Sequence, residues 1–178
     1  MRGRKSTPTS RVRRAELRDI AQAVALFSEL DAFERRWRIF ALRGNPAVTA
    51  AKRYRRLIRS GKGCVALAEL DSTVVGISVG EVIRPSSSSD QEALEISHVY
   101  VQPEHCNRGL GSALVAEIVD FALEKRVQWV TLKVFAANHR AIDYWTHLGL
   151  RPQLIQFTSR VESVEAELVA LRMRVVRE

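Results

Sequence analysis

The stretch from Val99 to Ala113 constrains the fold of this chain more than any other segment. An apolar, β-branched run stops at Pro103, a short polar turn follows, and two glycines then open an amphipathic helix. The first backbone N–H groups of a helix lack internal partners, so this order of elements predicts an anion site. Gly109 and Gly111 carry no side chains that would keep a ligand from the backbone, and Arg108 adds positive charge. The alternative is a plain strand-to-helix connection, because a lone Gly-x-Gly is a weak signal.

Hydrophobic periodicity predicts alternating helices and strands along the rest of the chain. Helices are expected from Ile20 to Leu30, from Pro46 to about Ser60, from Leu110 to Glu124 and from Asn138 to Leu148. Strands are expected over Arg11–Ala15, Cys64–Leu70, Thr73–Ile83, Leu94–Val101, Val127–Phe135, Arg151–Thr158 and Ala166–Val175. The strand at Val127–Phe135 is expected to be buried on both faces. The segments Asp31–Asn45 and Pro85–Asp90 are expected to be irregular. The pattern predicts a single α/β domain.

The charge of the chain is concentrated at its beginning. Of the formal net charge of +8, six positive charges precede the first acid, Glu16: Arg2, Arg4, Lys5, Arg11, Arg13 and Arg14. Residues 1–10 hold little to bury, so we expect a flexible basic tail before a domain over residues 11–178. Such a tail attracts acidic partners through charge alone, but a solvated tail is the simpler interpretation and nucleic-acid binding is not expected.

Other bulk features predict a cytoplasmic protein with no membrane span. No run of about 18 apolar residues is present, and the basic N-terminus lacks the apolar core of a secretory signal. Cys64 and Cys106 are the only cysteines and fall in different predicted elements, which is typical of reduced thiols.

Three features together resemble the Gcn5-related N-acetyltransferase (GNAT) family. Cys106 to Gly111 is similar to the family's pyrophosphate loop, Gln/Arg-x-x-Gly-x-Gly/Ala. Asn138, Ala141 and the pair Tyr144-Trp145, followed by Leu148-Gly149-Leu150, resemble its Asn-x-x-Ala-x-x-Phe-Tyr-x-x-x-Gly-Phe stretch. The third feature is the order of the elements. The resemblance implies a mixed twisted sheet of about six or seven strands, splayed between the fourth and fifth, with about four flanking helices.

The resemblance also implies acetyl-CoA as co-substrate and no metal. The pantetheine arm would pair with the backbone of Val99, Tyr100 and Val101, and the pyrophosphate would meet the helix N-terminus. The implied cofactor residues of that turn are Asn107, Arg108, Gly109, Leu110, Gly111, Ser112 and Ala113, and those of the later helix are Asn138, Ala141, Tyr144 and Trp145. Cys106 departs from the family pattern, which has Gln or Arg there. Asn138 is equally well placed to cap its helix.

Acetyl transfer to an amine needs a base, and the strand at Leu94–Val101 offers two candidates. Strand alternation places Glu95 with Ser97, Val99 and Val101 on one face, and His98 on the other with Leu94, Ile96 and Tyr100. Only one candidate would then face the acceptor, although a bulge would shift this register. Packing of His98 in the core and a surface role for Glu95 are the alternatives.

The source of the proton for the leaving thiolate is ambiguous. The family often uses a Tyr at the position of Trp145, and indole is no acid. Tyr144 is the neighbouring candidate but lies about 100° around the helix. Departure of the thiolate unaided, with a reference pKa of about 8.5, is the alternative.

Acceptor selection is expected to involve the segment after the first helix. Asp31 and Glu34 are candidates to attract a cationic amine, and Phe33 and Trp37 to stack on it. Ordinary aromatic packing is the alternative. The sequence therefore predicts an enzyme that acetylates a primary amine of a small molecule, with a peptide or protein amine as the second choice and a non-catalytic acetyl-CoA-binding module as the third. The resemblance leaves a homodimer open.

Overall fold

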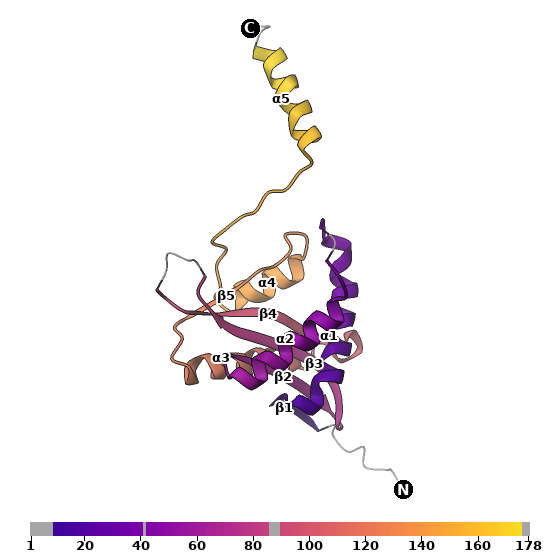
Figure 1. Ribbon diagram of the computed structural model, residues 1–178, viewed down its shortest axis with the longest axis vertical. Coiled ribbons are helices and arrows are strands. Elements are labelled where there is room, and N and C mark those ends of the chain that lie inside the picture. Colours follow the sequence, from indigo (N-terminus) through magenta and orange to yellow (C-terminus); the bar gives the residue numbers. More distant parts are fainter. Residues whose placement is uncertain (1–8, 41, 86–89, 176–178) are drawn as a thin grey trace. The chain divides into compact units, whose positions relative to one another are not determined.

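The computed structural model describes residues 9–40, 42–85 and 90–175. The predicted tail over residues 1–10 therefore lies mostly outside the described residues, and Ser10 already belongs to the first strand. The chain divides into two compact units, residues 1–137 and 138–178. The first holds the sheet and three long helices, and the second holds two helices (Figure 1).

A five-stranded mixed sheet forms the centre of the first unit. Strands β1 (Ser10–Arg14), β2 (Gly63–Leu70), β3 (Thr73–Ile83) and β4 (Ala93–Val101) follow one another in antiparallel order. Strand β5 (Trp129–Leu132) then pairs parallel to β4. Asp71 and Ser72, the two residues between the predicted strands Cys64–Leu70 and Thr73–Ile83, form a tight turn between β2 and β3. Their φ values of 49° and 67° give the left-handed geometry that follows the twist of a hairpin.

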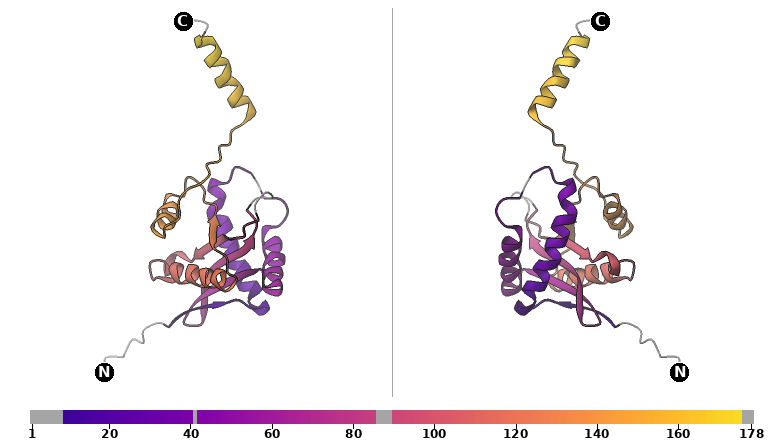
Figure 2. Two further views of the ribbon diagram at one scale, coloured as in Figure 1. Left: turned by 90° about the vertical axis from the view of Figure 1, so that its left-hand side faces the viewer. Right: turned by 90° about the vertical axis from the view of Figure 1, so that its right-hand side faces the viewer.

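Helices cover both faces of this sheet (Figure 2). Helix α3 (Leu110–Glu124) lies on one face, where the Ser78 hydroxyl donates to the Leu114 carbonyl at 3.0 Å. Helices α1 (Ile20–Glu34) and α2 (Pro46–Ser60) lie on the other, over a core that includes Tyr54, Leu57, Leu67, Ile77 and Val79. The predicted start of α2 is confirmed, because Pro46 is its first residue and the Asn45 side chain accepts from two backbone N–H groups.

The prediction of which residues share a face of β4 is wrong, because β4 contains a β-bulge at Ser97. His98 pairs with Val79, but Ile96 pairs with Gly80, so Ser97 has no partner residue on β3. The extra residue shifts the alternation by one position. Glu95 and His98 therefore share the face covered by α1 and α2, whereas the prediction placed them on opposite faces.

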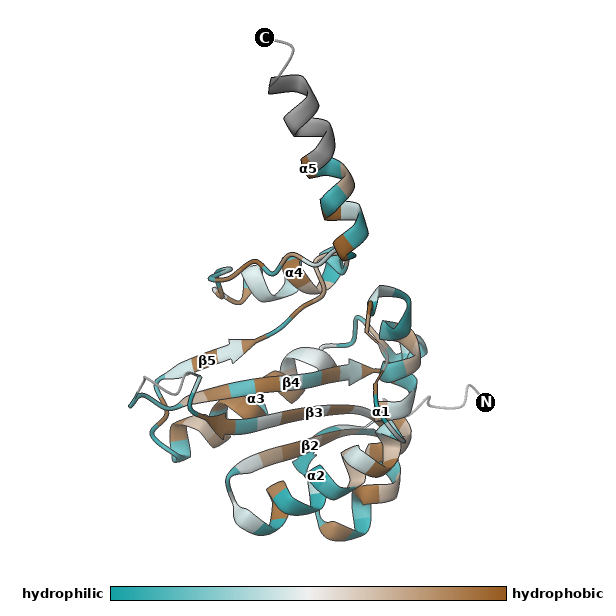
Figure 3. Cartoon of the chain, turned by 45° about the horizontal axis from the view of Figure 1, so that its top comes forward, coloured by the Kyte–Doolittle hydropathy of each residue, from teal (hydrophilic) through white to brown (hydrophobic). Residues whose placement is uncertain are grey.

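The sheet opens between β4 and β5, as expected. Their pairing runs only from Ala93↔Trp129 to Ile96↔Leu132, whereas β3 continues to pair with β4 as far as Val101. Figure 3 shows β5 leaving β4 at this point. The end of β4 beyond Ile96 therefore carries a backbone edge that no described strand occupies.

Several predicted elements near the end of the chain are wrong. Strand β5 is four residues long instead of spanning Val127–Phe135, because its pairing with β4 ends at Leu132 and no described strand covers its other edge. Trp129 is 59% exposed, so this strand is not buried on both faces. Residues 151–160 form no regular element, and Val161–Val175 is helix α5 instead of a strand. Its Glu, Ala, Leu, Met and Arg residues favour helix, and Val161, Val164 and Leu168 recur at helical spacing.

These changes alter the predicted number of elements. Among the described residues there are five strands instead of six or seven, and five α-helices instead of about four. The segment expected to be irregular after Leu30 begins later, because α1 continues to Glu34 and a 3₁₀ turn follows at Arg35–Trp37. The loop prediction at Pro85–Asp90 falls largely on residues 86–89, outside the described residues.

In the second unit, helix α4 (His139–His147) begins where predicted. The Asn138 side chain accepts from the backbone N–H of Ala141 at 3.2 Å, so the capping role of Asn138 is confirmed. None of the described helices is long and apolar enough to cross a membrane.

Asp19 is a buried carboxylate that ties β1 to the start of α1. It accepts from Nη1 and Nη2 of Arg13 at 2.6 and 3.0 Å and from the Glu16 backbone N–H at 2.7 Å. The hydrogen bonds from Arg13, opposed by burial, lower the pKa of Asp19 to about 2. Because the folded-state pKa is depressed, the carboxylate stabilises the fold above the unfolded pKa near 4, and this contribution is lost as the pH falls toward 2.

We predict that Asp19→Asn lowers the free energy of unfolding by about 2 kcal/mol at pH 7 and by little near pH 2, where the native carboxyl also protonates. Urea unfolding at both pH values measures the difference. Asp120→Asn, at an exposed position of α3, is the matched control and should stay within about 0.5 kcal/mol. An equal loss at both pH values would contradict the role of the charge.

Candidate active site

The turn before α3 presents backbone N–H groups with no side chain over them. Its N-cap, Gly109, has a φ of 79° and Asn107 has a φ of 60°, so the backbone turns through left-handed positions on both sides of Arg108. No described side chain caps this helix end. The N–H groups of Leu110, Gly111 and Ser112 therefore lack the intrahelical partners found deeper in a helix and suit an anion.

Gly111 has no steric reason within the described structure to be glycine. It lies in the first turn of α3 with no positive φ, and an added Cβ would meet no atom within 4 Å. Glycine inside a helix costs about 0.5–1 kcal/mol relative to alanine. The backbone at Gly111 is therefore open to the approach of another molecule.

Side chains near this turn support its backbone. Nη2 of Arg108 reaches the Glu104 carbonyl at 3.5 Å. The Cys106 thiol lies 3.6 Å from the carbonyl oxygens of both Val101 and Gln102, at the junction of strand and turn. The departure from Gln or Arg at position 106 therefore places a small side chain against the backbone and leaves the N–H groups of α3 unchanged.

The end of β4 contributes its backbone to the site. Val99, Tyr100 and Val101 lie beyond the last residue that pairs with β5. The Tyr100 hydroxyl donates to Glu29 at 3.1 Å, and burial together with Glu29 raises the pKa of Tyr100 to about 12. Since the Tyr100 side chain is held toward α1, the backbone is what this residue offers to a ligand.

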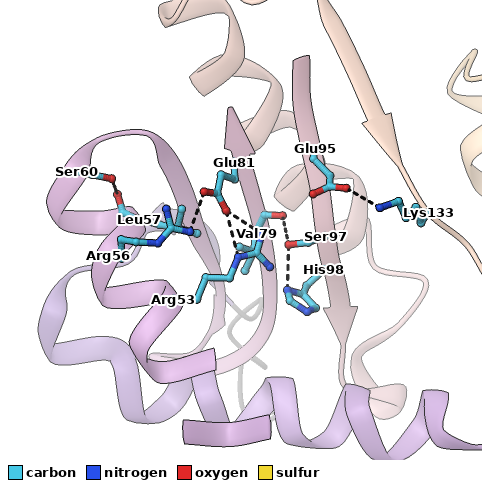
Figure 4. A network of polar contacts seen from close by, with 10 residues as sticks. All are labelled: Arg53, Arg56, Leu57, Ser60, Val79, Glu81, Glu95, Ser97, His98 and Lys133. Carbon is cyan, nitrogen blue, oxygen red and sulfur yellow. Dashed lines mark hydrogen bonds and ion pairs between the residues drawn. The ribbon is translucent and has the colours of Figure 1, made fainter. Parts of the chain in front are cut away.

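Glu95 lies on β4 at the point where the sheet opens (Figure 4). Its side chain is 25% exposed, and Oε1 lies 3.4 Å from Nζ of Lys133, just after β5. An exposed ion pair of this kind contributes about 0–1 kcal/mol, so it leaves the carboxylate available. Glu81 on β3 is the residue that pairs directly with Glu95 on β4.

His98 is half-buried and packs among aromatic side chains. Its ring packs edge-on against Phe27, with centroids 5.0 Å apart, and against Tyr54 at 6.2 Å, while Nδ1 lies 3.2 Å from the Ser97 hydroxyl. Burial, reinforced by the charge of Arg53, lowers the pKa of His98 to about 4. A ring that stays neutral among aromatic side chains is better suited to packing than to proton transfer.

The predicted acceptor residues already have partners. Asp31 accepts from Arg38 at 2.7 Å and also pairs with Arg35 at 3.5 Å. Glu34 lies 3.9 Å from Arg38, and burial is the main cause that raises the pKa of Glu34.

The aromatic candidates are partnered in the same way. The Arg36 guanidinium lies over Phe33 at 4.0 Å and over Trp37 at 4.5 Å from the ring centroids. Trp37 also lies 6.2 Å from the ring of Phe135, which follows β5. The structure thus brings the segment after α1 beside the segment after β5.

The candidates in the second unit lie on α4. The rings of Tyr144 and Trp145 pack edge-on with centroids 5.0 Å apart. The Tyr144 hydroxyl is buried and has no hydrogen-bond partner among the described residues. A buried polar group without a partner needs an explanation, and binding of a ligand is one.

Sequence reasoning missed a set of charged residues around Glu95. Glu81 accepts from Nε and Nη2 of Arg53, both at 3.2 Å, and from Nη2 of Arg56 at 2.8 Å. The available signal was Glu81 itself, the one charged residue of strand β3. A hollow of about 520 Å³ lies over α2, lined by Lys52, Arg55, Arg56, Arg59 and Ser60, so it shares Arg56 with the contacts of Glu81. It lies on one helix, away from the turn before α3.

Relatives with known names share parts of this sequence. An uncharacterized N-acetyltransferase of Archaeoglobus fulgidus is 28% identical over 55% of this chain and 67% of its own length. A thialysine N-epsilon-acetyltransferase of Sus scrofa is 32% identical over 32% of this chain and 33% of its own length. An uncharacterized N-acetyltransferase of Methanocaldococcus jannaschii is matched over only 37% of its length. The chain thus spans about a third of the length of some curated relatives.

Solved structures share the fold at low sequence identity. A predicted acetyltransferase from Clostridium acetobutylicum, crystallised with acetyl-CoA, has a TM-score of 0.69 at 12% identity and covers 87% of this chain and 98% of its own. An aminoglycoside N-acetyltransferase in complex with CoA has a TM-score of 0.71 at 12% identity, covering 88% and 98%.

A family model decides the assignment. The model of the acetyltransferase (GNAT) family matches residues 25–150, a range that includes the sheet opening, the glycine turn and α4. This chain belongs to the acetyltransferase (GNAT) family.

Proposed function

We propose that this protein is an acetyl-CoA-dependent N-acetyltransferase that acts on a primary amine of a small molecule. One observation carries the proposal: the β4 edge beyond Ile96 is open beside a helix N-terminus without a side-chain cap. An extended pantetheine arm suits a strand edge, and a pyrophosphate suits the N–H groups of α3. The solved relatives that contain acetyl-CoA or CoA support this choice of ligand.

Glu95 is the base in this proposal. It is partly exposed at the opening of the sheet, whereas the ring of His98 packs against Phe27 and Tyr54. Glu95 takes a proton from the ammonium group of the acceptor, and the free amine then attacks the thioester carbonyl. The oxyanion that forms needs N–H donors, which the open β4 edge can supply. When the intermediate collapses, the carbon–sulfur bond breaks, the nitrogen releases its remaining extra proton to solvent to give the neutral amide, and coenzyme A leaves as a thiolate.

Tyr144 is the proposed proton donor to that thiolate. Trp145 occupies the position where the family often has a tyrosine, and the buried Tyr144 hydroxyl lacks a described partner. We do not assign this role to Trp145, because an indole N–H is a hydrogen-bond donor and not an acid at neutral pH.

The cofactor proposal predicts that substitutions at Gly111 weaken acetyl-CoA binding without destabilising the fold in the case of alanine. Gly111→Ala should raise the free energy of unfolding by about 0.5–1 kcal/mol, because the added Cβ meets no atom, and should weaken acetyl-CoA binding. Gly111→Glu should abolish binding through bulk and charge. Calorimetric titration and thermal unfolding measure the two properties.

Ala116→Glu is the control for this pair, because it adds the same charge at an exposed position farther along α3. It should bind acetyl-CoA as the native protein does. Full binding by Gly111→Glu would place the cofactor elsewhere.

The base assignment predicts that Glu95→Gln lowers kcat about 10²- to 10⁴-fold, with little change in acetyl-CoA affinity or in Tm. Coenzyme A release measures turnover. Glu92→Gln, an exposed position just before β4, removes an equal charge and should keep the native rate. Native turnover by Glu95→Gln would exclude Glu95 as the base, and binding of acetyl-CoA with no turnover on any amine would favour the non-catalytic module.

The acid assignment predicts that Tyr144→Phe separates activity from stability. Removal of a buried hydroxyl without a described partner should leave the free energy of unfolding unchanged or raise it, while kcat falls at least tenfold. Unchanged kcat would show that the thiolate leaves without Tyr144.

A further inference from the structure

The groups predicted to attract a cationic acceptor are neutralised within the protein. Asp31 and Glu34 face Arg35 and Arg38, and the rings of Phe33 and Trp37 are covered by Arg36. A second cation would therefore meet an arginine at each of these places. Like charges brought together in this way oppose binding.

The carboxylates on the face of β3 and β4 covered by α1 and α2 are also paired with cationic side chains of the protein. Glu81 holds two guanidinium groups, those of Arg53 and Arg56, and Glu95 holds Lys133 (Figure 4). One carboxylate balances only one of the two arginines, so a positive charge is left over at Glu81, the residue that pairs with Glu95. In these two groups of contacts, four carboxylates face five cationic side chains: Arg35, Arg38, Arg53, Arg56 and Lys133. Arg36, over the aromatic rings, adds a sixth positive charge.

Arg56 is the side chain best placed to bind an anion. It is 55% exposed and donates to Glu81 through Nη2, which is its one hydrogen bond and ion pair among the described residues. Arg53 is more buried, at 27% exposure, and is fixed by two contacts with the same carboxylate oxygen. A guanidinium with unused N–H donors suits a carboxylate, which it binds in a fork geometry.

We propose that the acceptor carries a carboxylate as well as its amine, and that Arg56 is a specificity-determining residue that binds this carboxylate. The proposal rests on the proposed function, because it places the amine at Glu95. Glu81 and Glu95 are directly opposed on neighbouring strands, where Cβ atoms lie about 5 Å apart. Since Arg56 lies beyond Glu81, the amine and the carboxylate of the acceptor are separated by several bonds. Polycationic amines are excluded by the surplus of positive charge.

A matched pair of amines tests the proposal. Nα-acetyl-lysine and its carboxamide have the same side-chain amine and differ in one negative charge, and spermidine supplies a polycation. Each is titrated calorimetrically into the full chain loaded with coenzyme A, and turnover is measured separately with acetyl-CoA. We expect the carboxylate to bind at least fivefold more tightly than the carboxamide at low salt, with the preference falling as salt is raised.

Two variants test whether Arg56 causes the preference for the carboxylate over the carboxamide. Arg56→Gln should reduce it to less than twofold, whereas Arg55→Gln, an exposed neighbour with no described ion pair, should preserve it. The proposal would be overturned if Nα-acetyl-lysine did not bind, or if it bound no more tightly than its carboxamide or than spermidine. It would also be overturned if the preference for the carboxylate survived in Arg56→Gln. Binding with the expected preference but no turnover would instead count against the proposed function alone.

Discussion

The separation of β4 from β5 is the constraint on which the rest of the site depends. Parallel pairing stops at Ile96 and Leu132, and the next residue of β4, Ser97, is the bulge. A bulge increases local twist and bends its strand, so these adjacent features together turn the end of β4 away from its neighbour. The result is an open backbone edge on β4, in a sheet that has α3 on one face and α1 and α2 on the other. That edge, and the N-terminus of the same α3, are what the proposed cofactor would bind.

The same bulge determines which side chains of β4 share the face covered by α1 and α2. Without it, Glu95 and His98 would point to opposite faces of the sheet; with it, both lie on the α1–α2 face. They differ in surroundings, because His98 lies among Phe27 and Tyr54 while Glu95 lies at the rim beside a solvent-exposed lysine. Burial therefore separates a packing residue from a candidate base on one face, which strand alternation alone does not do.

Local signals in the sequence predicted the starts of three helices, including the turn before α3. The glycines at 109 and 111, the proline at 46 and the asparagine at 138 each act through their own backbone or cap, so their effects are visible in sequence. The bulge was not predicted, because it depends on pairing with β3. Apolar residues after Gly149 were read as strands, but helix formers govern Val161–Val175. The pairing of Asp31 with Arg38 and of Glu81 with Arg53 and Arg56 was missed because partners in space need not be regularly spaced in sequence.

Amide chemical shifts of ¹⁵N-labelled protein during titration with coenzyme A test the central claim most directly. The account predicts that the largest changes occur at the amides of Leu110, Gly111 and Ser112 and along Val99–Val101, with small changes at the exposed basic residues of α2. Changes confined to α2, with the glycine turn and the β4 edge unaffected, would contradict it.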